Sequence, residues 1–356
     1  MKLSLKILAS HVCVLMAMLM MISCEHRVLE DPINTHYIRI YFDQNIKNVT
    51  CGFYNENLEK PHYEVPRAVR VVLAHPESGS VIAERYLQEQ GTDENGYYIH
   101  GYISAQPGEY NLLVYSLGSP HTLIQNINDY YRMRAYTNPV SDQYSKYMPI
   151  INETKATEGI SQQPDHLFHE VMEPVILNRT TKIDTIYNAE GDFFKAHSLV
   201  KSYYIQVKVN GIEWASSAMS VLGGMAKTSI LHRHDGINES EPTNILFSMK
   251  RGDCEQSTSN GNGNKSAILY TTFHTFGKLP DYPNKLNVIF EFMKRDGTSQ
   301  VEEIDITDMF ATPMVREHQW ILIEKEIELD PPEGGGPGGM TPGVDDWTDV
   351  ESEIHL

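Results

Sequence analysis

Short runs of β-branched and aromatic residues recur along the first half of the chain, and each ends at Gly, Pro, Asn or Asp. This pattern is typical of short β-strands joined by turns. Asn95-Gly96 and Pro107-Gly108 predict tight turns between neighbouring strands. We therefore expect an antiparallel β-sandwich in this half. Its predicted strands are 37–42, 68–75, 97–103 and 110–115.

The second half repeats the pattern with clearer alternation. From Tyr203 to Val209, hydrophobic residues occupy every second position, as in a strand with one buried face. We expect Gly223-Gly224 to end the strand that begins at Ala218, and Asp296-Gly297 to form a hairpin turn. The spacing predicts a second sandwich. Its strands are 203–209, 218–222, 244–249, 267–276, 285–293, 300–306 and 319–327.

Residues 118–165 show little periodicity and contain many Tyr, Asn and Ser residues. A long excursion of this kind in a compact domain is typical of a binding or contact region. Within it, Asp129 to Ala135 favours a helical turn. Tyrosine suits a contact because it presents a flat apolar face with a polar tip, although it also suits strands. The candidate contact residues are Tyr130, Tyr131, Tyr136 and Tyr144.

The first residues of the chain resemble a bacterial lipoprotein signal. Lys2 and Lys6 precede an apolar run from Ile7 to Ile22, and Cys24 follows directly before polar residues. We interpret 1–23 as the signal peptide, Cys24 as the lipidated residue and 24–33 as a tether. An ordinary cleaved signal or a retained helix remain alternatives, although the run is shorter than the roughly 20 residues that a membrane-spanning helix needs. Lipid chains on Cys24 would anchor the protein to a membrane.

The last residues form a separate pattern. Residues 331–344 are rich in Gly and Pro and predict a flexible linker. Residues 345–356 alternate again, which predicts a strand. A lone strand is unstable unless it joins a sheet, either of its own chain or of a neighbouring molecule, and the sequence leaves both open. The candidate donor residues are Trp347, Val350, Ile354 and Leu356.

The chain has 29 basic and 47 acidic residues and a net charge of -18. This charge disfavours binding to nucleic acid. Only Cys51 and Cys254 remain available for a disulfide, since Cys13 lies in the signal and Cys24 is the lipidation site. Their spacing does not decide whether they pair.

Catalytic and metal-binding motifs are weak. The chain has no Gly-x-Ser-x-Gly elbow and no phosphate-binding glycine loop after a strand, so we expect no enzymatic activity and no cofactor. His166 and His169 are spaced for one face of a helix, but Pro164 and Pro174 disfavour a helix there, so we expect no metal site. Residues 232–236 also contain two histidines, and they favour a turn rather than a metal site.

Several segments carry a resemblance by their order and spacing. These are Cys24 with its short polar lead, Pro107 to Ser116, Pro164-Asp165-His166-Leu167-Phe168, Tyr203 to Val209 with Leu222-Gly223-Gly224-Met225-Ala226, and Asp305-Ile306-Thr307. Through them, nearly the whole chain after the signal resembles the Bacteroidales fimbrial anchor and accessory lipoproteins of the minor-fimbrium anchor type. The resemblance implies an all-β fold of two tandem transthyretin-like antiparallel β-sandwiches. It also implies assembly with other fimbrial subunits by strand exchange.

Together these features predict two β-sandwich domains, at 34–187 and 188–330. They favour an outer-membrane, lipid-anchored protein that serves as an anchor or accessory subunit of a fimbria-like assembly, on an undetermined side of the membrane. The resemblance implies that shaft-forming subunits carry a protease-cleaved N-terminal extension. Such an extension is not evident here, because Cys24 lies only a few residues before the first predicted strand, and this favours a base or accessory subunit. The alternative function is glycan binding by a surface lipoprotein through its tyrosines. Thr185, within Asp184-Thr185-Ile186, resembles a short acceptor motif for O-glycosylation in this bacterial group.

Overall fold

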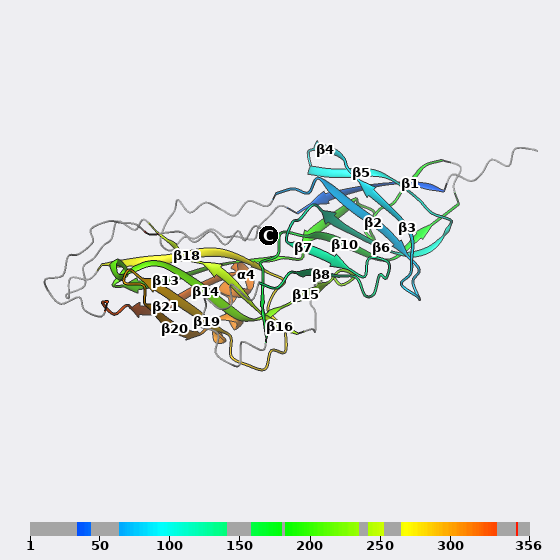
Figure 1. Cartoon of the computed structure of the whole chain (residues 1–356). Helices are drawn as coiled ribbons and strands as arrows, with labels where there is room; N and C mark the ends of the chain where they lie inside the picture. The colour runs from blue at the N-terminus through cyan, green and yellow to red at the C-terminus, as the bar shows by residue number, and fades with distance from the viewer. Residues whose placement is uncertain are drawn as a thin grey trace, which may run out of the picture.

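The computed structural model describes residues 34–43, 64–140, 158–179, 182–234, 241–252, 265–332 and 347. Strands dominate these residues and build an N-terminal and a C-terminal body that lie end to end (Figure 1). The predicted all-β class is confirmed. The likeness of each body to transthyretin remains a prediction.

The N-terminal body is one continuous sheet that folds over on itself. Its strand order is β3-β2-β6-β10-β12-β1-β5-β4, and β11 pairs beside β1. Strands β1, β4 and β5 lie across one side of the body, opposite β2, β3, β6 and β10 (Figure 1). The bounds are β1 Thr35–Phe42, β2 Ala68–Ala74, β3 Val81–Leu87, β4 Glu89–Asp93, β5 Gly96–Ser104, β6 Gly108–Leu117, β10 Phe168–Leu177, β11 Asp184–Thr185 and β12 Phe194–Ser198.

Side-chain alternation explains the core of this body. Ile38 and Ile40 of β1 belong to one hydrophobic cluster with Leu112 and Val114 of β6, and all four side chains are fully buried. Burying one such side chain contributes about 1.5–3 kcal/mol. A buried cation lies outside this cluster: the Nη1 of Arg70 donates to the Tyr115 hydroxyl at 2.7 Å, and its Nε donates to Glu84 at 2.9 Å.

The C-terminal body is a sandwich of two sheets. One has the order β17-β18-β13-β21, and the other has the order β20-β19-β14-β16-β9. Among its described residues, three short helical segments complete the body. The bounds are β9 Ile160–Ser161, β13 Lys201–Asn210, η1 Ile212–Trp214, β14 Ala215–Ala226, β16 Pro242–Ser248, β17 Lys250–Arg251, β18 Ser266–Thr275, β19 Asn287–Lys294, β20 Ser299–Asp305, η2 Asp308–Ala311, α4 Pro313–His318 and β21 Trp320–Glu328.

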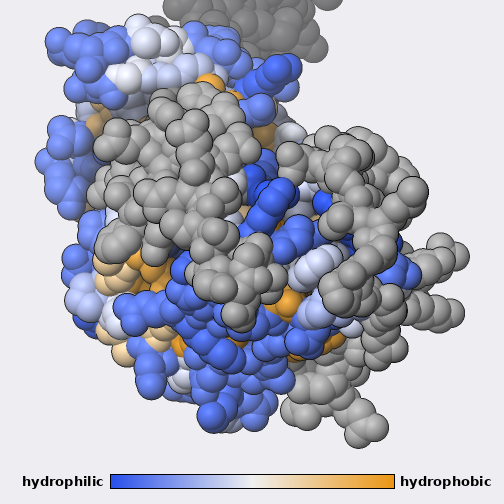
Figure 2. Space-filling view, turned by 90° about the vertical axis from the view of Figure 1, so that its left-hand side faces the viewer, coloured by the Kyte–Doolittle hydropathy of each residue, from blue (hydrophilic) through white to orange (hydrophobic). Residues whose placement is uncertain are grey.

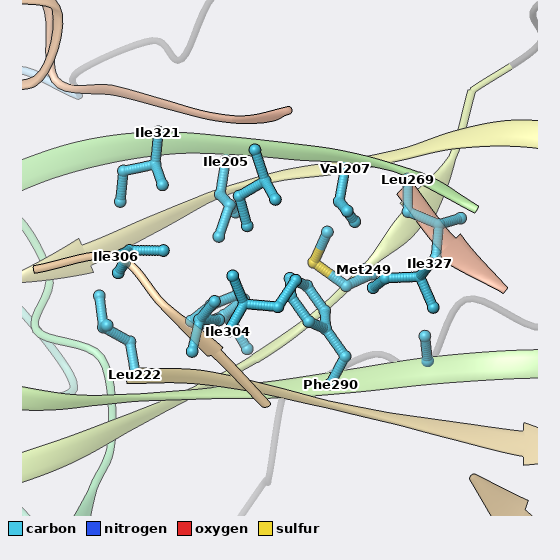
Figure 3. Packing of buried hydrophobic residues seen from close by; sticks show 14 of the residues in the cluster. Ile205, Val207, Leu222, Met249, Leu269, Phe290, Ile304, Ile306, Ile321 and Ile327 are labelled. Carbon is cyan, nitrogen blue, oxygen red and sulfur yellow. The ribbon is translucent and has the colours of Figure 1, made fainter. Parts of the chain in front are cut away.

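The core of the C-terminal body lies between these two sheets. Figure 3 shows Ile205 and Ile321 on one side of the core and Leu222 and Phe290 on the other, all belonging to one buried cluster. Phe247 and Phe273 stack with their ring centroids 4.3 Å apart, so the sheets are also joined by aromatic contacts.

Three sequence predictions need correction. The strand that begins near Ala218 does not end at Gly223-Gly224, because β14 continues to Ala226 through an irregularity in its pairing with β16. Gly224 has a φ of +78°, which glycine adopts readily, so this pair marks a bulge rather than an end. Asp129 to Ala135 forms turns that lead into a strand rather than a helical turn. The sandwiches are not purely antiparallel, because β1 pairs in parallel with β12, and β13 with β21.

The boundary between the bodies also differs from the predicted division after residue 187. β12 pairs with β1 and β10, so the N-terminal body extends to Ser198. β9 comes from the first half of the chain but pairs with β16 of the C-terminal body. Both strands are too short to show a periodic pattern, so the sequence predicted neither of them.

The described surface at the end of the C-terminal body is mostly hydrophilic, with hydrophobic residues in small areas (Figure 2). This agrees with the high acidic content of the chain. Within the described ranges, no helix combines the length and the apolar character needed to cross a membrane.

Candidate functional site at the junction of the two bodies

The predicted excursion at 118–165 joins the two bodies. Its hairpin consists of β7 (Thr122–Gln125) and β8 (Arg134–Thr137), and β8 pairs with β15 (Thr228–Ile230) from the second half of the chain. Farther along, β9 enters the sheet of the C-terminal body beside β16. The segment that the sequence singled out as a contact region therefore makes its described contacts within the chain.

A third hydrophobic cluster is shared by both bodies. Val72 and Leu113 contribute to it from the N-terminal sheet, whereas Leu231, Phe276 and Leu279 contribute from the C-terminal half. All five side chains are buried. Because this packing would be lost if the bodies separated, the cluster holds their relative orientation.

Polar side chains add contacts across the junction. The Nε2 of Gln163 donates to the Leu246 carbonyl at 3.1 Å, and its Oε1 accepts from the His274 backbone N–H at 3.0 Å. Inside the C-terminal sheet, where β9 joins β16, the hydroxyls of Ser161 and Thr243 lie 2.8 Å apart and are buried. Buried polar groups favour one geometry because any other would leave them unpaired.

A cavity of about 400 Å³ opens at this junction. Its lining includes the end of β6, the segment before β10 and His274 of β18. The rings of His166 and His274 meet edge to face there, with their centroids 4.8 Å apart. Burial lowers the pKa of His166 to about 3 and that of His274 to about 4, so both imidazoles are neutral at pH 7.

The candidate contact tyrosines have different environments. The prediction is wrong for Tyr130, whose side chain is fully buried in the shared cluster and donates to Glu173 at 2.6 Å. Burial, and then Glu173, raise the pKa of Tyr130, so its hydroxyl stays protonated. Tyr131 is 38% exposed, and its hydroxyl bonds to the Pro76 carbonyl. Tyr136 is half-buried within β8, and Tyr144 lies outside the described residues.

Most of the candidate residues at the two ends of the chain lie outside the residues that the structure describes. Cys24 and the stretch 1–33 lie outside the described residues, as do Val350, Ile354 and Leu356. Trp347 is described and packs, partly buried, against the core of the C-terminal body. One of the four candidate donor residues therefore contacts its own chain.

Other predicted positions are placed as follows. Thr185 lies in β11 beside Tyr37 of β1 and is half-buried, and its glycosylation stays a prediction. Cys51 and Cys254 lie outside the described residues. In the part of the chain that the structure describes, no group of three or more His, Cys, Asp or Glu side chains could hold a metal ion.

Sequence reasoning missed one surface. Tyr37, Arg39 and Tyr41 alternate along β1 beside Tyr98 and Tyr102 of β5, so these side chains gather on one face of the sheet, where Tyr102 is 47% exposed and Tyr41 is buried. The alternation of residues along each strand indicated which side chains share this face. The surface was not recognised because the pairing of β1 with β5 cannot be seen in the sequence.

Comparison with known proteins places the chain in a family. The family model described as "Domain of unknown function (DUF5119)" matches residues 59–248, which is more than half of the 356 residues. The chain belongs to this family. A DUF5119 relationship alone names no activity.

Individual relatives carry more specific names. The DUF5119 chain is 22% identical to the "Putative fimbrium anchoring subunit Fim4B" of Bacteroides ovatus, over 80% of this chain and 83% of that protein. A solved structure of a "putative adhesin" from Bacteroides ovatus has the same fold, with a TM-score of 0.55, 20% identity and coverage of 85% and 94%. The fimbrial anchor protein Mfa2 from Porphyromonas gingivalis aligns over 78% of this chain and 84% of its own, with 10% identity and a TM-score of 0.40.

Proposed function

We propose that this DUF5119 protein is a non-enzymatic, cell-envelope subunit of a fimbria-like assembly, in which it serves as an anchor or accessory component. The observation that carries the proposal is the match to Fim4B, because it extends over 80% of this chain and 83% of the relative. A match of that extent includes both bodies and the junction rather than one common domain. Its expected partners are other fimbrial subunits.

The junction suits such a role. A subunit at the base of a filament has to transmit force between the membrane and its neighbour. The shared cluster and the Gln163 contacts resist bending between the bodies, because bending would expose buried apolar surface and unpaired polar groups. We expect the two bodies to move as one unit.

The proposed attachment to the outer membrane depends on Cys24. A diacylglycerol on its thiol and an acyl chain on its amine would supply the two lipid signals that stable anchoring needs. In cells that express Cys24→Ala, we expect the protein to move from the membrane fraction to the soluble fraction. Cys13→Ala is the matched control and should leave the protein in the membrane. Membrane retention of Cys24→Ala would contradict lipid anchoring, and protease shaving of intact cells would show which side of the membrane carries the body.

The proposed assembly step is strand exchange by residues 345–356. Trp347 packs against the C-terminal core of its own chain, so donation of the strand would move this contact to a neighbouring subunit. Deleting 345–356 should abolish co-purification with the fimbrial subunits of the same cells if the tail acts on a neighbour. Trp347→Ala, which keeps the length of the tail, serves as the comparison that separates loss of the strand from loss of one contact. Unchanged co-purification after the deletion would rule out strand donation by the tail.

A further inference from the structure

The described chain begins at the end of the N-terminal body that lies away from the C-terminal body. Figure 1 shows the start of β1 at this end. The Asn34 carbonyl accepts from the Ala105 N–H at 2.9 Å, and the Asn34 side chain donates to Gln106 at 3.1 Å. The chain therefore enters the body beside the turn between β5 and β6. We call this end the distal pole, and it includes Asn34, Gln106, Ile176, Arg179, Lys182 and Ile183.

Two isoleucines of the distal pole are exposed to solvent. Ile176 is 65% exposed near the end of β10, where it pairs with Glu109 at the start of β6. Ile183 is 54% exposed and directly precedes β11, whose first residue, Asp184, pairs with His36 of β1. Both isoleucines therefore lie close to the point where the chain enters the body, and both leave most of their apolar surface uncovered.

The charges that flank the two isoleucines balance. Arg179 and Lys182 lie between them in the sequence, whereas Glu109 and Asp184 lie beside them in the sheet, so two positive and two negative charges cancel. All four of these residues are exposed. The chain as a whole has a net charge of -18, which repels it from an anionic surface. A neutral end is the part of such a protein that approaches a membrane with the least repulsion.

The proposed lipid anchor would hold the distal pole close to a membrane. Asn34 follows Cys24 by ten residues, and a fully extended chain of that length spans at most about 35 Å. Within this distance the effective concentration of the pole at the bilayer is high, so even weak contacts are formed. A compact domain of about 100 residues is itself about 35 Å across, so it would fit between the pole and the bilayer only beside a fully stretched tether. The position of the pole therefore favours the bilayer over another protein as its partner.

We propose that the distal pole docks on the phospholipid bilayer that holds the Cys24 anchor, with Ile176 and Ile183 at the boundary between headgroups and acyl chains. Apolar side chains gain free energy by leaving water for that boundary. Arg179 and Lys182 carry long apolar stems with charged ends, which suits residues at the level of the phosphate groups. The inference rests on the lipid anchor of the proposed function and adds an orientation to it. The protein stands on its N-terminal end, and its C-terminal body faces away from the bilayer toward neighbouring subunits.

The test is tryptophan fluorescence of the lipidated protein, purified in detergent and reconstituted into phosphatidylcholine vesicles. The three native tryptophans, at 214, 320 and 347, lie in the C-terminal half of the chain, so Ile183→Trp places a reporter in a body that has none. Bromine on the acyl chains quenches a tryptophan that enters the bilayer. We expect brominated vesicles to remove about half of the emission that Ile183→Trp adds to the wild-type signal, because docked apolar side chains lie about 5–10 Å into the boundary. Val301→Trp, at a position of the C-terminal body that is 43% exposed, is the matched control and should lose none of its added emission.

A charge at the other isoleucine tests whether the two residues act as one surface. Adding Ile176→Asp to Ile183→Trp should reduce the quenching at least about twofold, because a carboxylate resists transfer out of water. Adding Tyr86→Asp instead places the same charge at a position of β3 that is 52% exposed, and the quenching should stay unchanged. Matching urea unfolding midpoints for these variants and the wild type would show that the exposed substitutions leave the protein folded.

Failure of the docking and failure of the anchor give different results. A protein that does not incorporate into the vesicles would show that the lipid anchor is wrong, and the docking would fail with it. A protein that incorporates, but whose Ile183→Trp emission is quenched no more than that of Val301→Trp, would leave the anchor standing and overturn the docking. Quenching that persists with Ile176→Asp would overturn it as well. Loss of fimbrial-subunit binding in Ile183→Asp, without any quenching of Ile183→Trp, would assign the distal pole to a protein partner instead.

Discussion

Replacing His274 with glutamine tests whether buried imidazoles at the junction make the protein less stable in mild acid. Burial lowers the pKa of His274 to about 4, whereas a histidine in an unfolded chain has a pKa of 6.5. The nearby Asp165 raises the pKa of His274 but does not offset the effect of burial. The folded protein therefore binds fewer protons at this site than the unfolded chain. Stability from the neutral imidazole is complete above pH 6.5 and is lost as the pH falls from 6.5 toward 4.

The size of the effect follows from these two pKa values. At pH 5 the unfolded His274 is almost fully protonated, whereas the folded His274 is mostly neutral. Between pH 7 and pH 5 this difference lowers the free energy of unfolding by about 2 kcal/mol. His166, whose pKa burial lowers to about 3, contributes a similar loss in the same interval. Protonation of either histidine therefore lowers the stability of the junction in acid.

The assay is urea unfolding at pH 7 and pH 5 for the wild type and for His274→Gln. The variant should lose about 2 kcal/mol less than the wild type over this interval, whatever its stability at pH 7. Burial also shifts the pKa values of His169 and Glu170, but both residues are present in both proteins, so their effects cancel. His75→Gln removes an exposed histidine and should behave as the wild type. If His274→Gln and the wild type lose the same free energy, the imidazole is not the acid-sensitive group and the reasoning fails.

Three further predictions concern stability at neutral pH, each measured as the free energy of unfolding in urea. Phe290→Ala should lower it by about 3–5 kcal/mol because it leaves a cavity in the C-terminal core, whereas Val301→Ala, at a side chain that is 43% exposed, should change it by less than about 0.5 kcal/mol. Arg70→Leu should lower it by about 3 kcal/mol, because the groups that it binds lose a charged donor, and a neutral result would show that the guanidinium contributes nothing. Tyr130→Phe should lower it by about 1–2 kcal/mol through loss of the bond to Glu173, and a larger loss would point to altered packing instead.

The strand content was predictable because it depends on local patterns. Alternation along β13 and the hairpin glycines Gly96 and Gly297, both with positive φ, appear in the sequence as clearly as in the structure. The bulge at Gly223-Gly224 was misinterpreted as an end, since glycine ends strands as readily as it bends them. A local signal of this kind carries two meanings, and only the neighbouring strand decides between them.

The junction was not predictable in the same way. His166 and His274 lie far apart in the sequence, and neither has a neighbouring motif that links them. Tyr130 is the same residue type as the exposed tyrosines, but packing of the β7–β8 hairpin against the C-terminal half buries its side chain. Burial depends on what arrives from elsewhere in the chain, so residue type alone could not separate a core tyrosine from a contact tyrosine.

The sequence by itself determined that this chain forms β-strands, which residues of β1 and β13 point inward, and where several turns lie, because a strand's two faces and a turn's φ are properties of consecutive residues. Only the tertiary structure decided that β12 closes the N-terminal sheet, that β9 and β15 join the bodies, and that Tyr98 lies over Gly91. Strands of two to five residues have no stability of their own, so their partners are chosen by the packing of the whole fold.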